Sequence, residues 1–134
     1  MVQITSFEKS GTSSAVSFIE TQQVKEGVEC DIYRFDDDTS RDLAIVRVSK
    51  GYKTPLQLVI KGDCTLEGFI SGVGTLTVVN HDSVTKKYVF KADKLGTQVE
   101  VKVGETMQWE AHEDLTFYEI CEPPYEDGRF QNLA

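Results

Sequence analysis

The feature that most constrains the fold is a two-residue periodicity of the apolar residues. Residues 99–103 read Val-Glu-Val-Lys-Val, so an extended chain carries three valines on one face and two charges on the other, because successive side chains of a strand alternate between faces. Residues 107–111 and 87–91 repeat the alternation, and the runs 43–48 and 56–60 are almost continuously apolar. Such patterns predict strands, the continuous runs being covered on both sides.

Turn-forming residues separate these predicted strands. Further strand patterns cover residues 31–35, 75–79 and 115–121, and Gly, Asn and Asp cluster in the intervening segments. The strongest helical pattern, Phe18 to Lys25, is short. Short strands spaced about 8–12 residues apart are typical of a sandwich or barrel. The expected fold class is therefore all-β.

The 134 residues suit one domain with two terminal extensions. Residues 1–15 are small and polar towards their end, which indicates a mobile arm or an exchanged edge strand. Residues 123–134 are expected to form a tail, because Pro123 and Pro124 remove two backbone donors from any ladder.

The net charge and the cysteine content limit the binding partners and the cellular compartment that can be expected. The net charge of −8 repels phosphate backbones and anionic lipids, so neither nucleic acid nor a membrane is an expected partner. Three widely spaced cysteines form no CxxC pair and no disulfide framework, and the first residues lack the pattern of a secretory leader. The expected location is the cytoplasm.

The middle of the chain resembles the first motif of the cupin superfamily. That motif runs Gly, five residues, His-x-His, a short gap, Glu, six residues, Gly. Here Gly51 is followed by five residues, and then Gln57 and Val59 take the histidine positions. Glu67 and Gly74 fit the second half, although the gap before Glu67 is longer than usual.

A later segment resembles the second cupin motif, starting at Gly104. Strict spacing places Glu110 at its proline position, His112 at its glycine position and Leu115 at its histidine position. A shortened loop would instead bring His112 to the histidine position. The resemblance implies a double-stranded β-helix, or jelly-roll barrel, with a ligand cavity at one mouth, and it implies a homodimer. Cupins include metal enzymes, metal-free sugar epimerases, storage proteins and sensors, so the fold leaves the function open.

No metal or other cofactor is expected. A cupin metal site needs several converging imidazoles, whereas this chain has His81 and His112 alone, and His81 lies in a turn-like segment. A weak, oxygen-rich site formed by His112 with Glu67 and Glu119 is the alternative.

The interior of the barrel is expected to bind a small polar ligand, such as a carbohydrate or an organic acid. Period two places Gln57 and Lys61 on the face that the motif turns inward, and polar groups on apolar walls are what such a pocket requires. The candidate ligand-binding residues are Gln57, Lys61, Glu67, Trp109, His112 and Glu119. Two structural alternatives remain: Glu67 paired with Lys61 or Arg47, and Trp109 packed in the core.

Two other functions stay open. The first is a metal-free isomerase or epimerase, in which His112 and Glu119 form a base and a tyrosine acts as the acid; the candidate acids are Tyr33, Tyr88 and Tyr118. The second is a dimeric interaction module whose barrel is filled by its own side chains.

Overall fold

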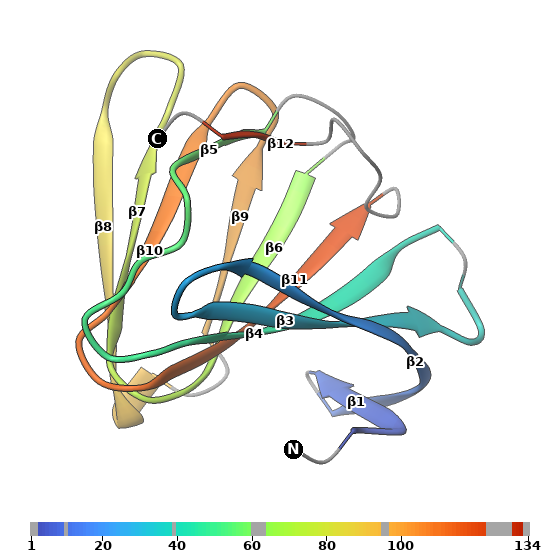
Figure 1. Ribbon diagram of the computed structural model, residues 1–134. Helices are drawn as coiled ribbons and strands as arrows, with labels where there is room; N and C mark the ends of the chain where they lie inside the picture. Colours follow the sequence, from blue (N-terminus) through green and yellow to red (C-terminus); the bar gives the residue numbers. More distant parts are fainter. Residues whose placement is uncertain are drawn as a thin grey trace.

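The computed structural model describes residues 3–9, 11–38, 40–59, 64–94, 97–122 and 130–132, and these form strands joined by turns (Figure 1). The elements, in chain order, are β1 (Ser6–Lys9), β2 (Thr12–Lys25), β3 (Val28–Phe35), β4 (Asp42–Val48), β5 (Gln57–Val59), β6 (Cys64–Ser71), β7 (Gly74–Val79), β8 (Thr85–Phe90), the 3-10 turn η1 (Ala92–Lys94), β9 (Gln98–Lys102), β10 (Thr106–Ala111), β11 (Leu115–Glu122) and β12 (Phe130–Asn132). The all-β prediction is confirmed.

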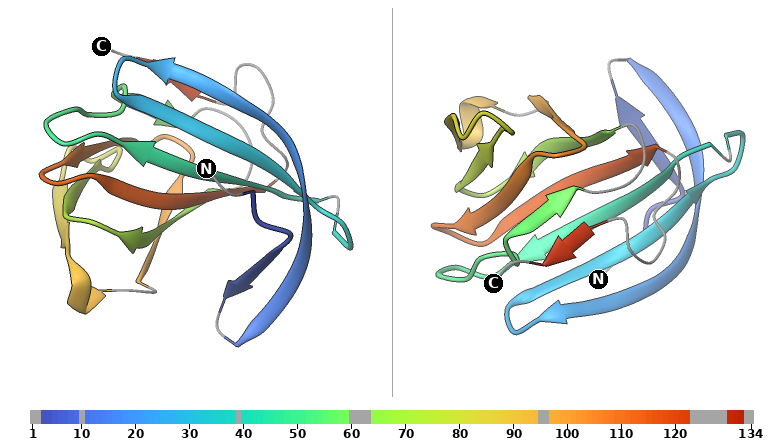
Figure 2. Two further views of the ribbon diagram at one scale, coloured as in Figure 1. Left: turned by 60° about the horizontal axis from the view of Figure 1, so that its bottom comes forward. Right: turned by 90° about the horizontal axis from the view of Figure 1, so that it is seen from above.

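The strands form two antiparallel sheets that curve around one interior (Figures 1 and 2). The larger sheet has the order β1-β2-β3-β4-β11-β6-β9, and the smaller has the order β12-β5-β10-β7-β8. One buried cluster joins them, since it contains Val28 and Phe117 from the larger sheet together with Leu76 and Trp109 from the smaller. This shared core is the interior of a barrel.

The alternation predicted from the sequence decides which side chains enter that interior. Along β11, Phe117 belongs to the barrel core, whereas Tyr118 and Ile120 belong to a second buried cluster. The second cluster lies on the outer face of the larger sheet, beneath the hairpin of β1 and β2. Phe7 of β1 packs edge-on against Tyr118, with ring centroids 4.9 Å apart. Residues 1–15 were expected as an arm or exchanged strand; from Ser6 onward they form this hairpin on their own chain.

A β-bulge at Ile19 changes the face that β2 presents. Before the bulge, Phe18 pairs with Tyr33, and after it Glu20 pairs with Ile32. The extra residue reverses the alternation. Phe18 therefore packs on the outer cluster, whereas Gln22 points towards the barrel interior.

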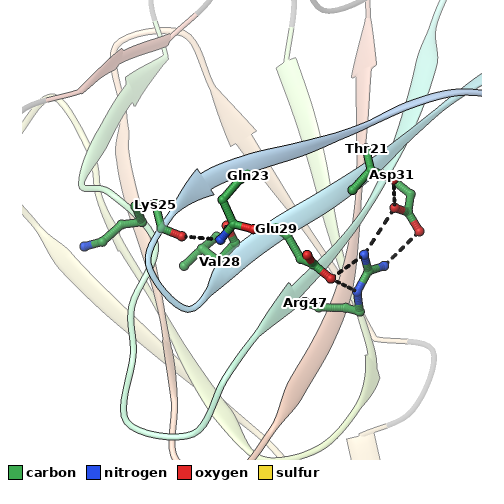
Figure 3. A network of polar contacts seen from close by, with 7 residues as sticks. All are labelled: Thr21, Gln23, Lys25, Val28, Glu29, Asp31 and Arg47. Atoms are coloured by element: carbon green, nitrogen blue, oxygen red, sulfur yellow. Dashed lines mark hydrogen bonds and ion pairs between the residues drawn. The ribbon is translucent and has the colours of Figure 1, made fainter. Parts of the chain in front are cut away.

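A network of polar contacts ties β2, β3 and β4 together on the outer face (Figure 3). Arg47 donates hydrogen bonds to Glu29 through Nε and Nη2 at 3.0 and 2.8 Å. It also donates to both carboxylate oxygens of Asp31 at 2.8 and 3.1 Å, and Thr21 Oγ1 adds a third donor to Asp31 at 2.7 Å. The Arg47 guanidinium is the main cause that holds the pKa of Asp31 below its ordinary value.

The C-terminal prediction is wrong for residues 130–132. β12 pairs with β5 through Phe130↔Val59 and Asn132↔Gln57, because these residues carry the backbone N–H groups that Pro123 and Pro124 lack. The two prolines lie outside the described residues. No helix among the described residues has the length and apolar character needed to cross a bilayer.

Candidate functional site

The barrel interior contains a cavity of about 210 Å³. Its walls come from β2, β3, β4, β11 and the start of β5, together with the segment that precedes β5. The lining residues are Gln22, Val24, Val28, Cys30, Ile32, Asp42, Ala44, Val46, Thr54, Pro55, Gln57, Phe117, Glu119 and Cys121. Polar side chains on otherwise apolar walls are the usual composition of a small-molecule site.

Stacked aromatic rings fill the interior next to the cavity. Trp109 lies parallel to Phe117, with centroids 4.2 Å apart, and Phe90 packs between Phe69 and Trp109. Thr54 fixes the backbone of Trp109, because its Oγ1 accepts the Trp109 N–H at 2.9 Å. Phe117 therefore presents a rigid apolar surface to the cavity.

Glu67 lies among these rings and is fully buried. Its Oε1 accepts the indole N–H of Trp109 at 2.8 Å. Its Oε2 meets no N–H or hydroxyl donor among the described residues. Glu119 is its cross-strand partner in the register of β6 and β11.

The environment of Glu67 favours its protonated form. Burial is the main cause that raises the pKa of Glu67 well above its ordinary value; the charge of Glu119 and a hydrogen bond between the two carboxyl groups raise it further. The Trp109 donor acts in the opposite direction. Desolvation of a carboxylate and a nearby like charge are both known to stabilise the neutral acid.

Glu119 lines the cavity, whereas Glu67 is buried behind the wall. The thiols of Cys30 and Cys121 also line the cavity. Cys121 Sγ donates to Glu119 Oε1 at 3.5 Å. Burial raises the pKa of the Cys30 thiol to about 12, and the negative charges of Glu119 and Asp31 contribute. Cys30 is therefore a neutral thiol and a poor nucleophile.

The structure brings together only some of the predicted site residues. Gln57 and Glu119 line the cavity, and Glu67 lies behind Glu119. Trp109 is 1 % exposed and supports Glu67 from the core. Lys61 lies outside the described residues.

His112 is not part of the cavity lining. It lies exposed in the turn between β10 and β11, where its Nε2 is 2.8 Å from Thr75 Oγ1. It is therefore not the base partner of Glu119 that the sequence suggested. Its turn lies between the buried residues Ala111 and Leu115.

Other contacts correct further expectations. Glu67 does not pair with Arg47, because Arg47 lies on the outer face and binds Glu29 and Asp31. Tyr33 and Tyr118 belong to the outer cluster and so cannot act as acids in the cavity. Tyr88 packs against the barrel core.

The residues at the cupin ligand positions do not fit a transition-metal site. Those positions hold Gln57, Val59, Glu67 and Leu115, and the carboxyl of Glu67 is already engaged by Trp109 and Glu119. Within the described ranges, no three His, Cys, Asp or Glu side chains are grouped so as to hold a metal ion. Imidazole ligands, which such metals prefer, are missing from the interior positions described.

Several lining residues were not predicted. Cys30 and Asp42 lie on inward-facing positions of β3 and β4, so strand alternation could have identified them once the inner face was known. Thr54 lies between strands, where no periodicity marks it. Gln22 follows the bulge at Ile19, which reverses the alternation without any signal in the sequence.

Comparison with known proteins identifies the fold. No protein-family model and no curated protein sequence matches the chain. Among solved structures, it is similar to the oxalate decarboxylase of Lactobacillus farciminis in a formate complex, with a TM-score of 0.70 and 18 % identity over 85 % of this chain and 33 % of that one.

Two further solved structures have a similar fold. Oxalate decarboxylase from Bacillus subtilis at pH 4.6 gives a TM-score of 0.68 with 21 % identity, covering 84 % of this chain and 29 % of that one. The 7S globulin of Momordica charantia gives 0.65 with 17 % identity, covering 86 % and 34 %. The chain thus spans about a third of the length of these proteins. They include enzymes and a globulin, so what they share with this chain is the architecture. The resemblance drawn from the two sequence motifs is confirmed at this level: the chain has the cupin fold.

Proposed function

We propose that this cupin barrel binds a small polar ligand in its cavity without the help of a metal ion. The observation that carries the proposal is the wall itself, where Gln57 and Glu119 offer hydrogen-bonding groups beside the flat ring of Phe117. A few polar groups set in apolar walls are the usual lining of a small-molecule site, so this lining suits a small ligand that is itself partly polar.

The size of the cavity limits the ligand. A cavity of 150 Å³ holds benzene, so a volume of about 210 Å³ accommodates roughly eight non-hydrogen atoms. Small polyols, short sugars and small organic acids have this size. Gln57 can donate and accept hydrogen bonds, which suits hydroxyl or carbonyl groups.

The proposal is tested by filling the cavity. Ala44→Leu adds three carbons to a residue that lines the cavity, whereas the control Ile45→Leu changes the next residue, which packs on the outer cluster. Binding of polyols, sugars and organic acids is measured by isothermal titration calorimetry, with and without EDTA. We expect at least one compound to bind the unaltered protein and Ile45→Leu equally, to fail with Ala44→Leu, and to be insensitive to EDTA. A panel with no binder, or a binder that Ala44→Leu does not affect, would contradict the proposal.

A further inference from the structure

Two polar side chains on β6 are fully buried with incomplete hydrogen bonding. Thr65 and Glu67 are both 0 % exposed. Thr65 Oγ1 has no hydrogen-bond partner among the described residues, and Glu67 Oε2 meets no N–H or hydroxyl donor there. Buried polar atoms in folded proteins are almost always hydrogen-bonded, to the protein or to ordered water. These two oxygens therefore call for a partner from outside the chain.

Both oxygens belong to the same face of the strand. Thr65 and Glu67 are two residues apart, so their side chains point to the same side of the sheet. That side is the barrel interior, because the β9 residues paired with them, Val101 and Val99, belong to the barrel core. The two Cα atoms lie about 6.6 Å apart along the strand. Two hydrogen bonds of about 2.8 Å each span a similar distance, so one oxygen atom placed between the side chains can reach both.

The side chains around Thr65 are short enough to leave room for such an atom. In the register of the larger sheet, Thr65 lies between Val101 and Cys121, and Cys121 lies next to Asp42. None of these is aromatic, in contrast to the stacked rings around Trp109. Cys121 and Asp42 also line the cavity. The interior at Thr65 therefore borders the cavity, and a small molecule can reach it from there.

We propose that the inner face of β6 binds one internal water molecule between Thr65 Oγ1 and Glu67 Oε2. Internal waters typically make about three hydrogen bonds to buried polar groups that lack a protein partner. Glu67 Oε1 accepts the indole N–H of Trp109, and the water supplies the partner for Oε2. The water therefore helps to hold the Glu67 carboxyl in the orientation that Trp109 requires.

The chemistry of the two oxygens suits water better than an ion. A threonine hydroxyl both donates and accepts, and a carboxyl group accepts when ionised and also donates when protonated. Water can complement either form, because it has two donors and two acceptor sites. A metal ion would need more ligands, and the described residues contain no group of three His, Cys, Asp or Glu side chains able to hold one.

The sign of one stability change tests the water. Thr65→Val keeps the shape of the side chain and removes only the hydroxyl. A hydroxyl buried without a partner is unfavourable, so its removal would raise the melting temperature. A hydroxyl bonded to water is favourable, and we expect Thr65→Val to lower the melting temperature by about 3–5 °C.

Thr77→Val is the matched control. Thr77 is half-buried on β7, between the core residues Leu76 and Val78, so its side chain faces outward. Its hydroxyl can bond to bulk solvent, and its removal should change the melting temperature by less than about 2 °C. The comparison separates the loss of a buried water contact from the general effect of replacing threonine by valine.

High-resolution crystal structures locate the water directly. Electron density for one water within hydrogen-bond distance of both oxygens is expected in the unaltered protein and in Thr65→Ser, which keeps the hydroxyl. The bridging water should be lost from Thr65→Val. A direct protein partner for Thr65 Oγ1, an interior without water between the two oxygens, or an unchanged or higher melting temperature of Thr65→Val would overturn the inference. Neither measurement uses a cavity ligand, so the result does not depend on the proposed function.

Discussion

Arg47→Ala tests whether the outer-face network holds the wall of the cavity in place. Thr21, Asp31 and Arg47 each precede or follow a residue that lines the cavity, so the network fixes the three strands from behind. The substitution removes the Arg47 hydrogen bonds to Glu29 and Asp31. The Asp31 side chain, 6 % exposed, would lose its hydrogen bonds from Arg47 and keep the one from Thr21.

The size of the effect follows from this burial. Breaking a buried ion pair by removing one partner costs about 3–5 kcal/mol. Here the cost is reduced because the side chains of Arg47 and Glu29 are 21 % and 43 % exposed. We expect Arg47→Ala to lower the free energy of unfolding by about 2–3 kcal/mol at pH 7. The control Lys50→Ala removes a contact with Glu113 in which both side chains are at least 60 % exposed, and it should cost less than about 0.5 kcal/mol.

The sign of the pH dependence is fixed by Asp31. Because Arg47 lowers its pKa in the folded protein, the stabilisation is present above the ordinary aspartate pKa and is lost as the pH falls through the folded value. Urea unfolding of both variants at pH 7 and at several values below 4 measures this. The difference between Arg47→Ala and the unaltered protein should shrink on acidification. A loss similar to that of Lys50→Ala, or one independent of pH, would refute the reasoning.

Three further predictions concern buried residues. Gly68→Ala should lower the melting temperature, at a cost of about 1–3 kcal/mol, because a Cβ there would overlap the ring of Tyr118; an unchanged melting temperature would contradict this packing. Glu67→Gln should remove a decrease of stability with rising pH. Since burial raises the pKa of Glu67, the unaltered protein should lose up to about 1.4 kcal/mol of unfolding free energy per pH unit above the ordinary carboxyl pKa. Chemical unfolding of both proteins between pH 5 and 8 measures the two pH dependences. Cys30, with a pKa of about 12, should react with iodoacetamide at pH 8 at least a hundredfold more slowly in the folded protein than in urea, as followed by mass spectrometry of the Cys30 peptide; equal rates would show that the thiol is accessible and ionised.

Much of the fold could be predicted because the strands alternate regularly. Residues 43–48 and 107–111 lie within β4 and β10, and 75–79 lie within β7. In β7 and β10 one face is buried, whereas β4 is covered on both faces, since Val46 lies in the barrel core and Leu43 in the outer cluster. In each case the sequence pattern and the structure reflect the same physical constraint. The N-terminal hairpin could not be predicted in this way, because the bulge at Ile19 interrupts the alternation of β2.

The candidate site was predictable only in part. The inward positions of Gln57 and Glu67 follow from the motif and from alternation along their strands. The contact between Glu67 and Glu119 depends on the register of β6 against β11, which is set by long-range packing. The exposure of His112 depends on the path of one turn, which spacing along the chain does not determine.

The bulge at Ile19 divides β2 into two strips with different selective constraints. Val16 and Phe18 pack on the outer cluster, so substitutions there must preserve apolar volume against Phe35 and Tyr33. Gln22 and Val24 line the cavity, so substitutions there would change its wall. The bulge therefore lets one continuous strand pack on the outer cluster with its first half and border the cavity with its second half, while Phe18 keeps its pairing with Tyr33 and Glu20 its pairing with Ile32.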